Sequence, residues 1–187
     1  MRIAVTGGIA EGKSTILSYI ADLGIQVESA DAIAREVMQS PHVQLAIASI
    51  LNSQPPFDRD LLRMKLAESP DFRKKLNSIT HPIIQERISK SEAQFFEIPL
   101  LFEACMQSQF DAVWVVTCGV DEQRRRLLKR YADLAQVEHL LRIQLPSRAK
   151  TPFSDVVIRT NEAEDRVRQL VTLSVSVVFN PTVARFG

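Results

Sequence analysis

Residues Gly7 to Ser14 have the types and the spacing of a loop that binds the phosphates of a nucleotide. They read Gly-Gly-Ile-Ala-Glu-Gly-Lys-Ser, which matches the pattern Gly-x-x-x-x-Gly-Lys-[Ser/Thr], and they follow a short apolar run from Arg2 to Thr6. Glycine lets the backbone approach a ligand closely, so successive N–H groups can turn toward phosphate oxygens at the positive end of the following helix. The alternative is an ordinary glycine turn before a helix.

The two side chains at the end of this loop suit phosphoryl transfer from ATP. Lys13 would reach the β- and γ-phosphates, and the Ser14 hydroxyl would bind a Mg²⁺ ion that arrives with the nucleotide. The residues expected to bind ATP are Gly8, Ile9, Ala10, Glu11, Gly12, Lys13, Ser14 and Thr15.

A carboxylate, Asp31, lies just beyond a second predicted strand at residues 25–28. It could accept a proton from an attacking hydroxyl, or hold that hydroxyl in line with the γ-phosphate. The alternative is a helix cap, because Ser29 or Asp31 at the start of a helix could accept from free N–H groups. Arg35 is one turn further on and could pair with Asp31, bind a substrate phosphate, or simply face solvent.

A basic run lies in the predicted helix at residues 121–131. Arg126 and Arg130 share one face of that helix, and two guanidinium groups on one face suit a lid that closes over ATP and neutralises the phosphoryl group during transfer. A solvated basic helix is the alternative. The run consists of Arg124, Arg125, Arg126, Lys129 and Arg130.

The histidines give a weaker signal. His81 precedes Pro82 and could contact a substrate, or it could be a structural or solvent-facing residue at a turn. His42 and His139 have no identifiable partners. No Ser-His-Asp arrangement and no metal-ligand cluster is evident, which leaves Mg²⁺ bound with the nucleotide as the expected metal.

Composition excludes several classes of function. The chain has 187 residues and a formal net charge of +1, so we expect no general binding to nucleic acid. Two cysteines without C-x-x-C spacing indicate neither a disulfide framework nor a zinc site, and a reducing cytoplasm is expected. No signal peptide is visible, and the longest apolar stretch, residues 170–179, is too short to span a bilayer. We expect no membrane contact and no obligate protein partner.

These candidate residues need a scaffold, and the pattern predicts an α/β protein. Strands are expected at residues 2–6, 25–28, 95–98, 112–117 and 155–158. Helices are expected after the phosphate loop, at about 30–38 and 121–131, and from about 162. Alternating strands and helices imply a parallel sheet covered on both faces, which binds ligands at the carboxyl ends of its strands.

Three stretches interrupt this alternation. Residues 41–92 are predicted to be helical, with breaks at 52–56, at Pro70 and at His81-Pro82, and form an insertion suited to a second substrate. Residues 146–152 are predicted to be a loop. The tail from Thr172 to Gly187 alternates Leu173, Val175 and Val177 with serines, which is typical of a strand.

Taken in order along residues 2 to about 161, these motifs resemble one family, dephospho-CoA kinase. Many nucleotide enzymes share the phosphate loop. The combination of Ala-Asp-x-x-Ala-Arg at residues 30–35, His-Pro at 81–82 and Pro-Leu-Leu-Phe-Glu at 99–103 is far narrower. Matching positions elsewhere are Leu23-Gly24, Arg59 with Leu62, Gln123 with Arg126 and Arg130, Gln144 with Pro146 and Lys150, and Asp155 with Val157-Ile158.

The resemblance implies transfer of the γ-phosphate of ATP to the ribose 3′-hydroxyl of dephospho-CoA, the last step of coenzyme A synthesis. It also implies a P-loop kinase fold, with a five-stranded parallel sheet flanked by helices. The chain would be a single kinase domain over residues 1–187. Its core would be about 1–39 and 93–187, its helical acceptor-binding insertion about 40–92, and its helical lid about 119–150.

The same resemblance implies roles for individual residues. Asp31 would act on the 3′-hydroxyl, and Lys13, Arg126 and Arg130 would assist the transfer. The residues expected beside the acceptor are Asp31, Arg35, His81, Pro99, Leu100 and Glu103.

The chain departs from the family pattern at several positions. Glu11 stands where a small serine is usual, Ser29 replaces the first aspartate of an Asp-Ala-Asp, and Tyr131 replaces an aspartate. A carboxylate near bound phosphates would repel them unless it faced solvent. We therefore expect Glu11 to face solvent and its replacement by serine to be tolerated.

Two other classes of function stay open on the residues alone. One is another P-loop small-molecule kinase, acting on a nucleoside or a shikimate-like alcohol. The other is a nucleotide-binding switch without turnover, although the Asn-Lys-x-Asp motif that reads guanine is absent.

Overall fold

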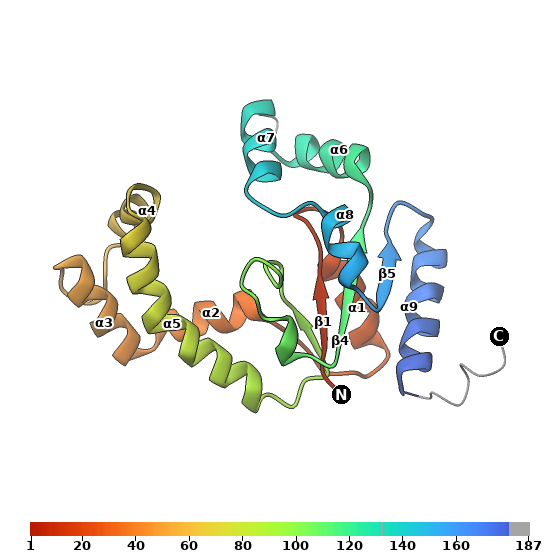
Figure 1. The fold of residues 1–187 in the computed structure, drawn as a ribbon, viewed down its shortest axis with the longest axis horizontal. Helices are drawn as coiled ribbons and strands as arrows, with labels where there is room; N and C mark the ends of the chain where they lie inside the picture. Colours follow the sequence, from red (N-terminus) through yellow and green to blue (C-terminus); the bar gives the residue numbers. More distant parts are fainter. Residues whose placement is uncertain (132, 180–187) are drawn as a thin grey trace. The chain divides into compact units, whose positions relative to one another are not determined.

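A computed structural model describes residues 1–131 and 133–179 (Figure 1). These residues form two compact units. The first contains Met1–Glu28 and the described residues from Ala93 onward, and the second contains Ser29–Glu92. The second unit therefore includes the helix after Asp31 as well as the expected insertion at residues 40–92.

The first unit is built on a five-stranded parallel sheet, as the alternating pattern predicts. Its strand order is β2-β3-β1-β4-β5. The strand β1 lies in the middle and pairs in parallel with β3 and β4, which places Val5 beside both Glu97 and Trp114. The strands are β1 (Ile3–Thr6), β2 (Val27–Ser29), β3 (Phe95–Glu97), β4 (Ala112–Thr117) and β5 (Val156–Arg159).

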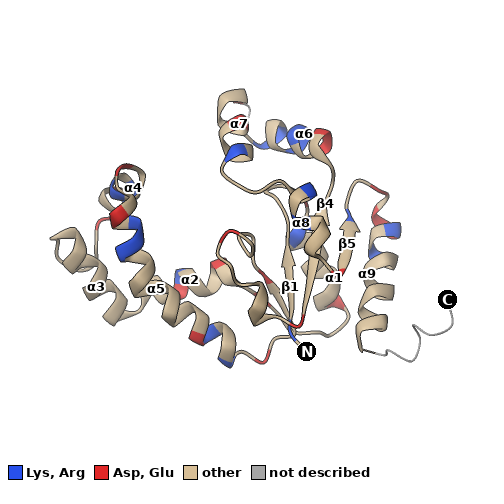
Figure 2. Cartoon of the chain, viewed as in Figure 1, with Lys and Arg blue, Asp and Glu red and all other residues tan. Residues whose placement is uncertain are grey.

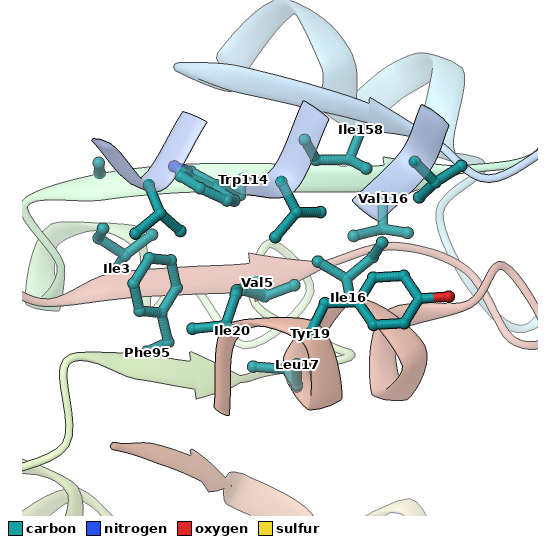
Figure 3. Packing of buried hydrophobic residues seen from close by; sticks show 14 residues of the cluster. Ile3, Val5, Ile16, Leu17, Tyr19, Ile20, Phe95, Trp114, Val116 and Ile158 are labelled. Atoms are coloured by element: carbon teal, nitrogen blue, oxygen red, sulfur yellow. The ribbon is translucent and has the colours of Figure 1, made fainter. Parts of the chain in front are cut away.

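One face of the sheet packs against the helices α1 (Lys13–Asp22) and α9 (Glu164–Phe179). Apolar side chains of α1 recur at helical spacing, so Ile16 and Ile20 point into the core toward Val5 of β1 (Figure 3). The Phe95 and Trp114 rings meet edge to face at a centroid distance of 5.0 Å. The buried residues along β4 confirm that both faces of the central strands are covered.

Residues 119–153 contain the helices α6 (Val120–Tyr131), α7 (Leu134–Arg142) and α8 (Ser147–Lys150), followed by a 3-10 turn at Thr151–Phe153. The prediction of a plain loop over residues 146–152 is therefore wrong. Both Ser147 and Lys150 are buried, and the Thr151 hydroxyl donates to the Ser147 carbonyl oxygen at 2.9 Å. These contacts stabilise a helical turn that local propensity does not reveal.

The predicted strand in the tail is also wrong, because α9 continues to Phe179. The three valines at positions 167, 171 and 175 follow a spacing of four residues and are buried against the sheet. Leu173 and Val177 lie on the outer side, 56% and 43% exposed. The part of that prediction covering residues 180–187 lies outside the described residues.

The second unit consists of the helices α2 (Ala30–Gln39), α3 (Pro41–Leu51), α4 (Arg59–Glu68) and α5 (Pro70–Lys90). Its predicted breaks at residues 52–56 and at Pro70 are confirmed. The Asp58 carboxylate caps α4 by accepting from the N–H of Asp60 at 2.8 Å, and Pro70 stands in the first turn of α5.

The predicted break at His81-Pro82 is wrong, since α5 runs through it. Proline in a helix removes the N–H that would bond to the carbonyl four residues earlier, and its ring clashes with that carbonyl, which usually bends the helix. Packing of α5 against α2, α3 and α4 holds the segment helical despite that cost. Among the described helices, none is both long and apolar enough to cross a membrane.

Candidate active site

The phosphate loop joins β1 to α1 at the carboxyl edge of the sheet (Figure 1). Two of its glycines are required by geometry. A Cβ added to Gly7 would overlap the carbonyl oxygen of Val116 at the end of β4. Gly12 starts α1 with φ of 94°, a left-handed conformation that side chains disfavour.

The start of α1 offers backbone N–H groups to an anion. The N–H of Ile16 donates to the Gly12 carbonyl oxygen at 3.1 Å, which opens the helical hydrogen-bond ladder. N–H groups in the turn before it have no intrahelical acceptor, as at any helix start. The Gly8 and Ile9 N–H groups instead donate to Ser147 Oγ at 3.1 Å and Gln144 Oε1 at 3.0 Å.

The Lys13 side chain folds back over the loop. It is 8% exposed, and its ammonium donates to the carbonyl oxygens of Gly7 and Gly8 at 3.2 and 2.9 Å. The loop backbone therefore orients the cation beside the turn of α1 where N–H groups are available.

A carboxylate that our sequence analysis missed lies beside Ser14. The Ser14 hydroxyl donates to Glu97 Oε1 at 3.3 Å, and Glu97 ends β3, the strand next to β1. A hydroxyl and a carboxylate are the oxygen ligands that Mg²⁺ prefers, so this pair fits the metal. The usable signal was the single acidic residue, Glu97, within the otherwise apolar stretch Phe95–Ile98.

The Glu11 side chain does not face solvent, so that expectation is wrong. It is 2% exposed, and its carboxylate accepts hydrogen bonds from the Gly8 N–H, the Ser147 hydroxyl and, at 3.0 Å, the Thr117 hydroxyl. The space behind the loop is polar, because β4 and α8 both present hydroxyl groups there. Hydrogen bonds from these protein groups thus stabilise the carboxylate in place of solvent.

Arg126 connects the basic helix to the phosphate loop. Its guanidinium donates to the Ala10 carbonyl oxygen at 3.4 Å and to the carbonyl oxygen of Thr160, after β5, at 2.6 Å. Glu122, one turn earlier on α6, accepts from Arg126 Nε at 2.8 Å. Hydrogen bonds from Arg125 and Arg126 lower the pKa of Glu122 to about 2, so its carboxylate stays ionised at neutral pH and orients both guanidinium groups.

The other cations of α6 make different contacts (blue in Figure 2). Arg124 pairs with Glu138 of α7 at 2.9 Å, and Arg125 pairs with Glu122 at 2.7 Å. The Arg130 guanidinium lies 5.4 Å from the centroid of the Tyr131 ring. Of the two arginines predicted to share a face, the structure thus brings Arg126 to the loop and places Arg130 beside Tyr131.

The segment Pro99–Glu103 is fastened to the same region by a buried lysine. Lys150 Nζ lies 3.0 Å from Glu103 Oε1 and donates to the Pro99 carbonyl oxygen at 3.2 Å. Glu103 also accepts from the Leu145 N–H at 2.9 Å. Glu103 is therefore held by contacts within the protein, while Leu100 is 46% exposed.

In the second unit, Asp31 and Arg35 lie one turn apart on α2. The Arg35 guanidinium donates to the Asp31 backbone carbonyl oxygen at 3.3 Å, not to its carboxylate. Ser29 is the residue before the helix, and its side chain makes no capping hydrogen bond. Within the described part of the chain the Asp31 carboxylate has no hydrogen bond or ion pair, so it is available to a ligand.

A cavity of about 240 Å³ in the second unit gathers basic side chains around an apolar floor. Arg35 of α2 lines it together with Arg59 and Arg63 of α4, and Phe57 and Leu62 supply apolar surface. His81 is exposed on α5 and is not among the residues that line this cavity. Three guanidinium groups around one cavity suit a phosphorylated ligand.

Metal sites built from protein side chains alone are not evident. In residues 1–131 and 133–179, no three His, Cys, Asp or Glu side chains gather closely enough to hold an ion.

The sheet is parallel, with strand order 2-3-1-4-5, and the phosphate loop joins its central strand to the first helix. An arginine-rich helix is hydrogen-bonded to that loop. Together these features define a P-loop kinase for small molecules. A family model described as dephospho-CoA kinase matches residues 1–165. The chain belongs to the dephospho-CoA kinase family.

Curated relatives agree with this assignment. A dephospho-CoA kinase from Synechococcus elongatus is 37% identical over 172 residues, which cover 84% of this chain and 82% of the relative. A dephospho-CoA kinase from Bdellovibrio bacteriovorus is 32% identical over 180 residues, with 88% and 90% covered.

Solved structures show the same fold. A protein from Thermus thermophilus matches with a TM-score of 0.81 at 24% identity, over 96% of this chain and 97% of that one. Dephospho-CoA kinase from Campylobacter jejuni matches with a TM-score of 0.70 at 25% identity, over 95% and 96%. A shikimate kinase from Acinetobacter baumannii, at a TM-score of 0.55 and 13% identity over 100% and 95%, shares the fold alone.

Proposed function

We propose that this kinase transfers the γ-phosphate of ATP to the ribose 3′-hydroxyl of dephospho-CoA through the residues described above. The observation that carries this assignment of roles is the Asp31 carboxylate, one turn from Arg35 on α2, for which the described residues provide no hydrogen bond or ion pair. The acceptor 3′-oxygen bonds to the γ-phosphorus, the bond from that phosphorus to the oxygen bridging the β- and γ-phosphates breaks, and ADP leaves. The proton of the 3′-hydroxyl passes to Asp31.

The nucleotide is held by the loop and the start of α1. Phosphate oxygens accept from the N–H groups of that turn, and Lys13 and Arg126 neutralise charge on the transferring group. Ser14 and Glu97 would hold a Mg²⁺ ion, which supplies further positive charge to the β- and γ-phosphates when it is bound. Arg130 joins the site as part of a lid over about residues 119–150.

In the second unit, arginine side chains bind the negatively charged diphosphate of the acceptor. Dephospho-CoA carries a diphosphate on the ribose 5′-oxygen, and the three arginines at the 240 Å³ cavity suit such a group. Arg35 lines this cavity and lies one helical turn from Asp31. A diphosphate bound in the cavity would therefore place the attached ribose near the Asp31 carboxylate. His81 and the Pro99–Glu103 segment are further positions proposed to lie near the acceptor.

The direct test is release of ADP from MgATP by the purified chain in the presence of dephospho-CoA. A matched panel contains a nucleoside, shikimate and adenosine, which has the acceptor ribose but no diphosphate. We expect turnover with dephospho-CoA and loss of most kcat/KM with adenosine. Equal turnover of another alcohol would favour a different small-molecule kinase, and ATP binding without any turnover would favour a switch. Both cysteines are free thiols, which suits the cytoplasm that we propose for this reaction.

A further inference from the structure

Glu11 is a buried acid in the phosphate loop to which the transfer reaction itself gives no role. Its two carboxylate oxygens take different partners. Oε2 accepts from the Gly8 N–H and the Ser147 hydroxyl, and Oε1 accepts from the Thr117 hydroxyl at 3.0 Å. The backbone carbonyl oxygen of Glu11 accepts from the Thr160 hydroxyl at 2.7 Å.

All three groups at the carboxylate act as donors, so both of its oxygens have hydrogen-bond partners within the protein. A buried carboxylate is costly unless hydrogen bonds replace its hydration, and hydrogen bonds to a charged group are the stronger kind. The Thr117 hydroxyl is oriented in turn, because it accepts from the Gly119 N–H at 3.2 Å. Removing the carboxylate would take this acceptor from the Thr117 and Ser147 hydroxyls and leave the Gly8 N–H with Ser147 Oγ alone.

The partners of Glu11 belong to separate parts of the first unit. Thr117 ends β4, and Ser147 begins α8. Ser147 is 136 positions from Glu11 in the sequence. Gly8 is within the phosphate loop itself, and a Cβ added there would lie 2.9 Å from Glu11 Oε2. The carboxylate thus fills the space behind the loop and fixes where the loop lies against β4 and α8.

This arrangement divides the loop into two parts. Gly8 and Ile9 turn their N–H groups toward Glu11, Ser147 and Gln144, behind the loop. Ser14 and Thr15 lie in the first turn of α1, where a helix offers N–H groups to a ligand.

We propose that Glu11 is a positioning residue for nucleotide binding, whose carboxylate anchors Gly8 to Thr117 and Ser147 so that the start of α1 presents its N–H groups to the phosphates. This inference rests on the proposed function only in taking ATP as the ligand of the loop. It reverses the expectation that a serine at this position is tolerated. A serine hydroxyl is too short to reach Thr117 and Ser147 together.

The test measures MgATP binding directly, by titration calorimetry of the full-length protein without acceptor. Three variants act on the carboxylate or its partners, namely Glu11→Ser, Glu11→Gln and Ser147→Ala. Glu162→Gln is the matched control, because Glu162 is an acid that pairs with Arg166 on the surface. We expect Glu11→Ser to weaken MgATP binding at least about tenfold, with a smaller loss for Glu11→Gln and no change for the control.

Two readouts separate positioning from simple loss of folded protein. The number of sites per chain should stay near one while the dissociation constant rises, since a purely structural defect would lower the number of sites. Ser147→Ala should weaken binding in the wild-type background and add little to Glu11→Ser, because both variants remove the hydrogen bond between Ser147 and Glu11. If Glu11→Ser does not fold, MgATP binding by Ser147→Ala and Thr117→Val tests the proposal. We expect both of these variants to bind MgATP more weakly than the wild type.

MgATP affinity within twofold of wild type in folded Glu11→Ser, or in both partner variants, would overturn the proposal. Because no acceptor is present, this outcome is independent of whether dephospho-CoA is the substrate. A protein that binds MgATP as expected but ignores dephospho-CoA would contradict the proposed function and leave the role of Glu11 supported.

Discussion

At the scale of single residues, Asp31 separates a chemical role from a capping role. We expect Asp31→Asn to lower kcat on the order of 10²-fold while MgATP affinity is preserved, because an amide cannot accept the proton. Asparagine caps helices about as well as aspartate, so a cap would survive the change. Steady-state kinetics and ATP titration check this, with Asp71→Asn, in the first turn of α5, as the control. Normal turnover of Asp31→Asn would contradict the role.

The two cysteines differ in reactivity because of burial. Cys118 is 2% exposed, and burial raises the pKa of its thiol to about 11, although Arg126 opposes this shift. At pH 8 fewer than about one in a hundred of these thiols is ionised, and the thiolate is the reactive form. A thiol reagent should label exposed Cys105 rapidly and Cys118 only after unfolding. Labelling of both at one rate in the native protein would disprove this.

Several single-residue features could be read from the sequence, and others could not. Roles for Lys13 and Asp31 are predictions that short motifs and strand ends support. The burial of Glu11 was missed, because the residues that stabilise it, Thr117 and Ser147, lie more than a hundred positions away. No local pattern encodes such a contact.

At the scale of elements, α6 contacts the phosphate loop through a specific side chain, Arg126, and its other cations make different contacts. Arg126→Lys should lower kcat/KM at least about tenfold, since an ammonium cannot bond to Ala10 and Thr160 at once. Lys129→Ala is the control, an exposed cation on the same helix. Arg130 shares the predicted lid face with Arg126, so Arg130→Ala belongs to the series. Values within about twofold for Arg126→Lys and Arg130→Ala would show that α6 is a solvated surface.

The short helix α8 joins the loop to the Pro99–Glu103 segment through Lys150. Lys150→Met should cost about 1–3 kcal/mol of unfolding free energy, because it leaves Glu103 without its cation in a mostly buried place. Lys74→Met removes an exposed pair and should cost less than about 0.5 kcal/mol. Urea denaturation of both variants gives the comparison. Equal costs would mean that the buried ion pair does not stabilise α8.

Predictions of helix or strand were correct where the apolar periodicity was strong, and were wrong where that periodicity was ambiguous. The strands and α1, α2 and α6 follow clear apolar patterns. The stretch from Thr172 alternates Leu173, Val175 and Val177 with serines, which fits a strand locally. Burial of positions 167, 171 and 175 against the sheet makes it helical, because a spacing of four residues places these side chains on one helix face.

At the scale of the whole molecule, that helical packing predicts unequal effects on stability. Val175→Ala should lower the unfolding free energy by about 1–3 kcal/mol through a cavity in the core. Val177→Ala, at a position 43% exposed, should cost under about 0.5 kcal/mol. In an alternating strand both valines would share one face and cost about the same. Thermal and chemical denaturation of the two variants distinguish these outcomes.

The chain alone determined the parallel α/β order, the phosphate loop and membership of a kinase family, because these depend on contiguous motifs and on apolar periodicity. The tertiary structure decided which loop N–H groups face the protein, which acid accompanies Ser14, and which cations are held by partners. Those features arise where residues distant in sequence meet at the carboxyl ends of the strands. There, burial makes each polar side chain find a partner, and the identity of that partner is a property of the fold.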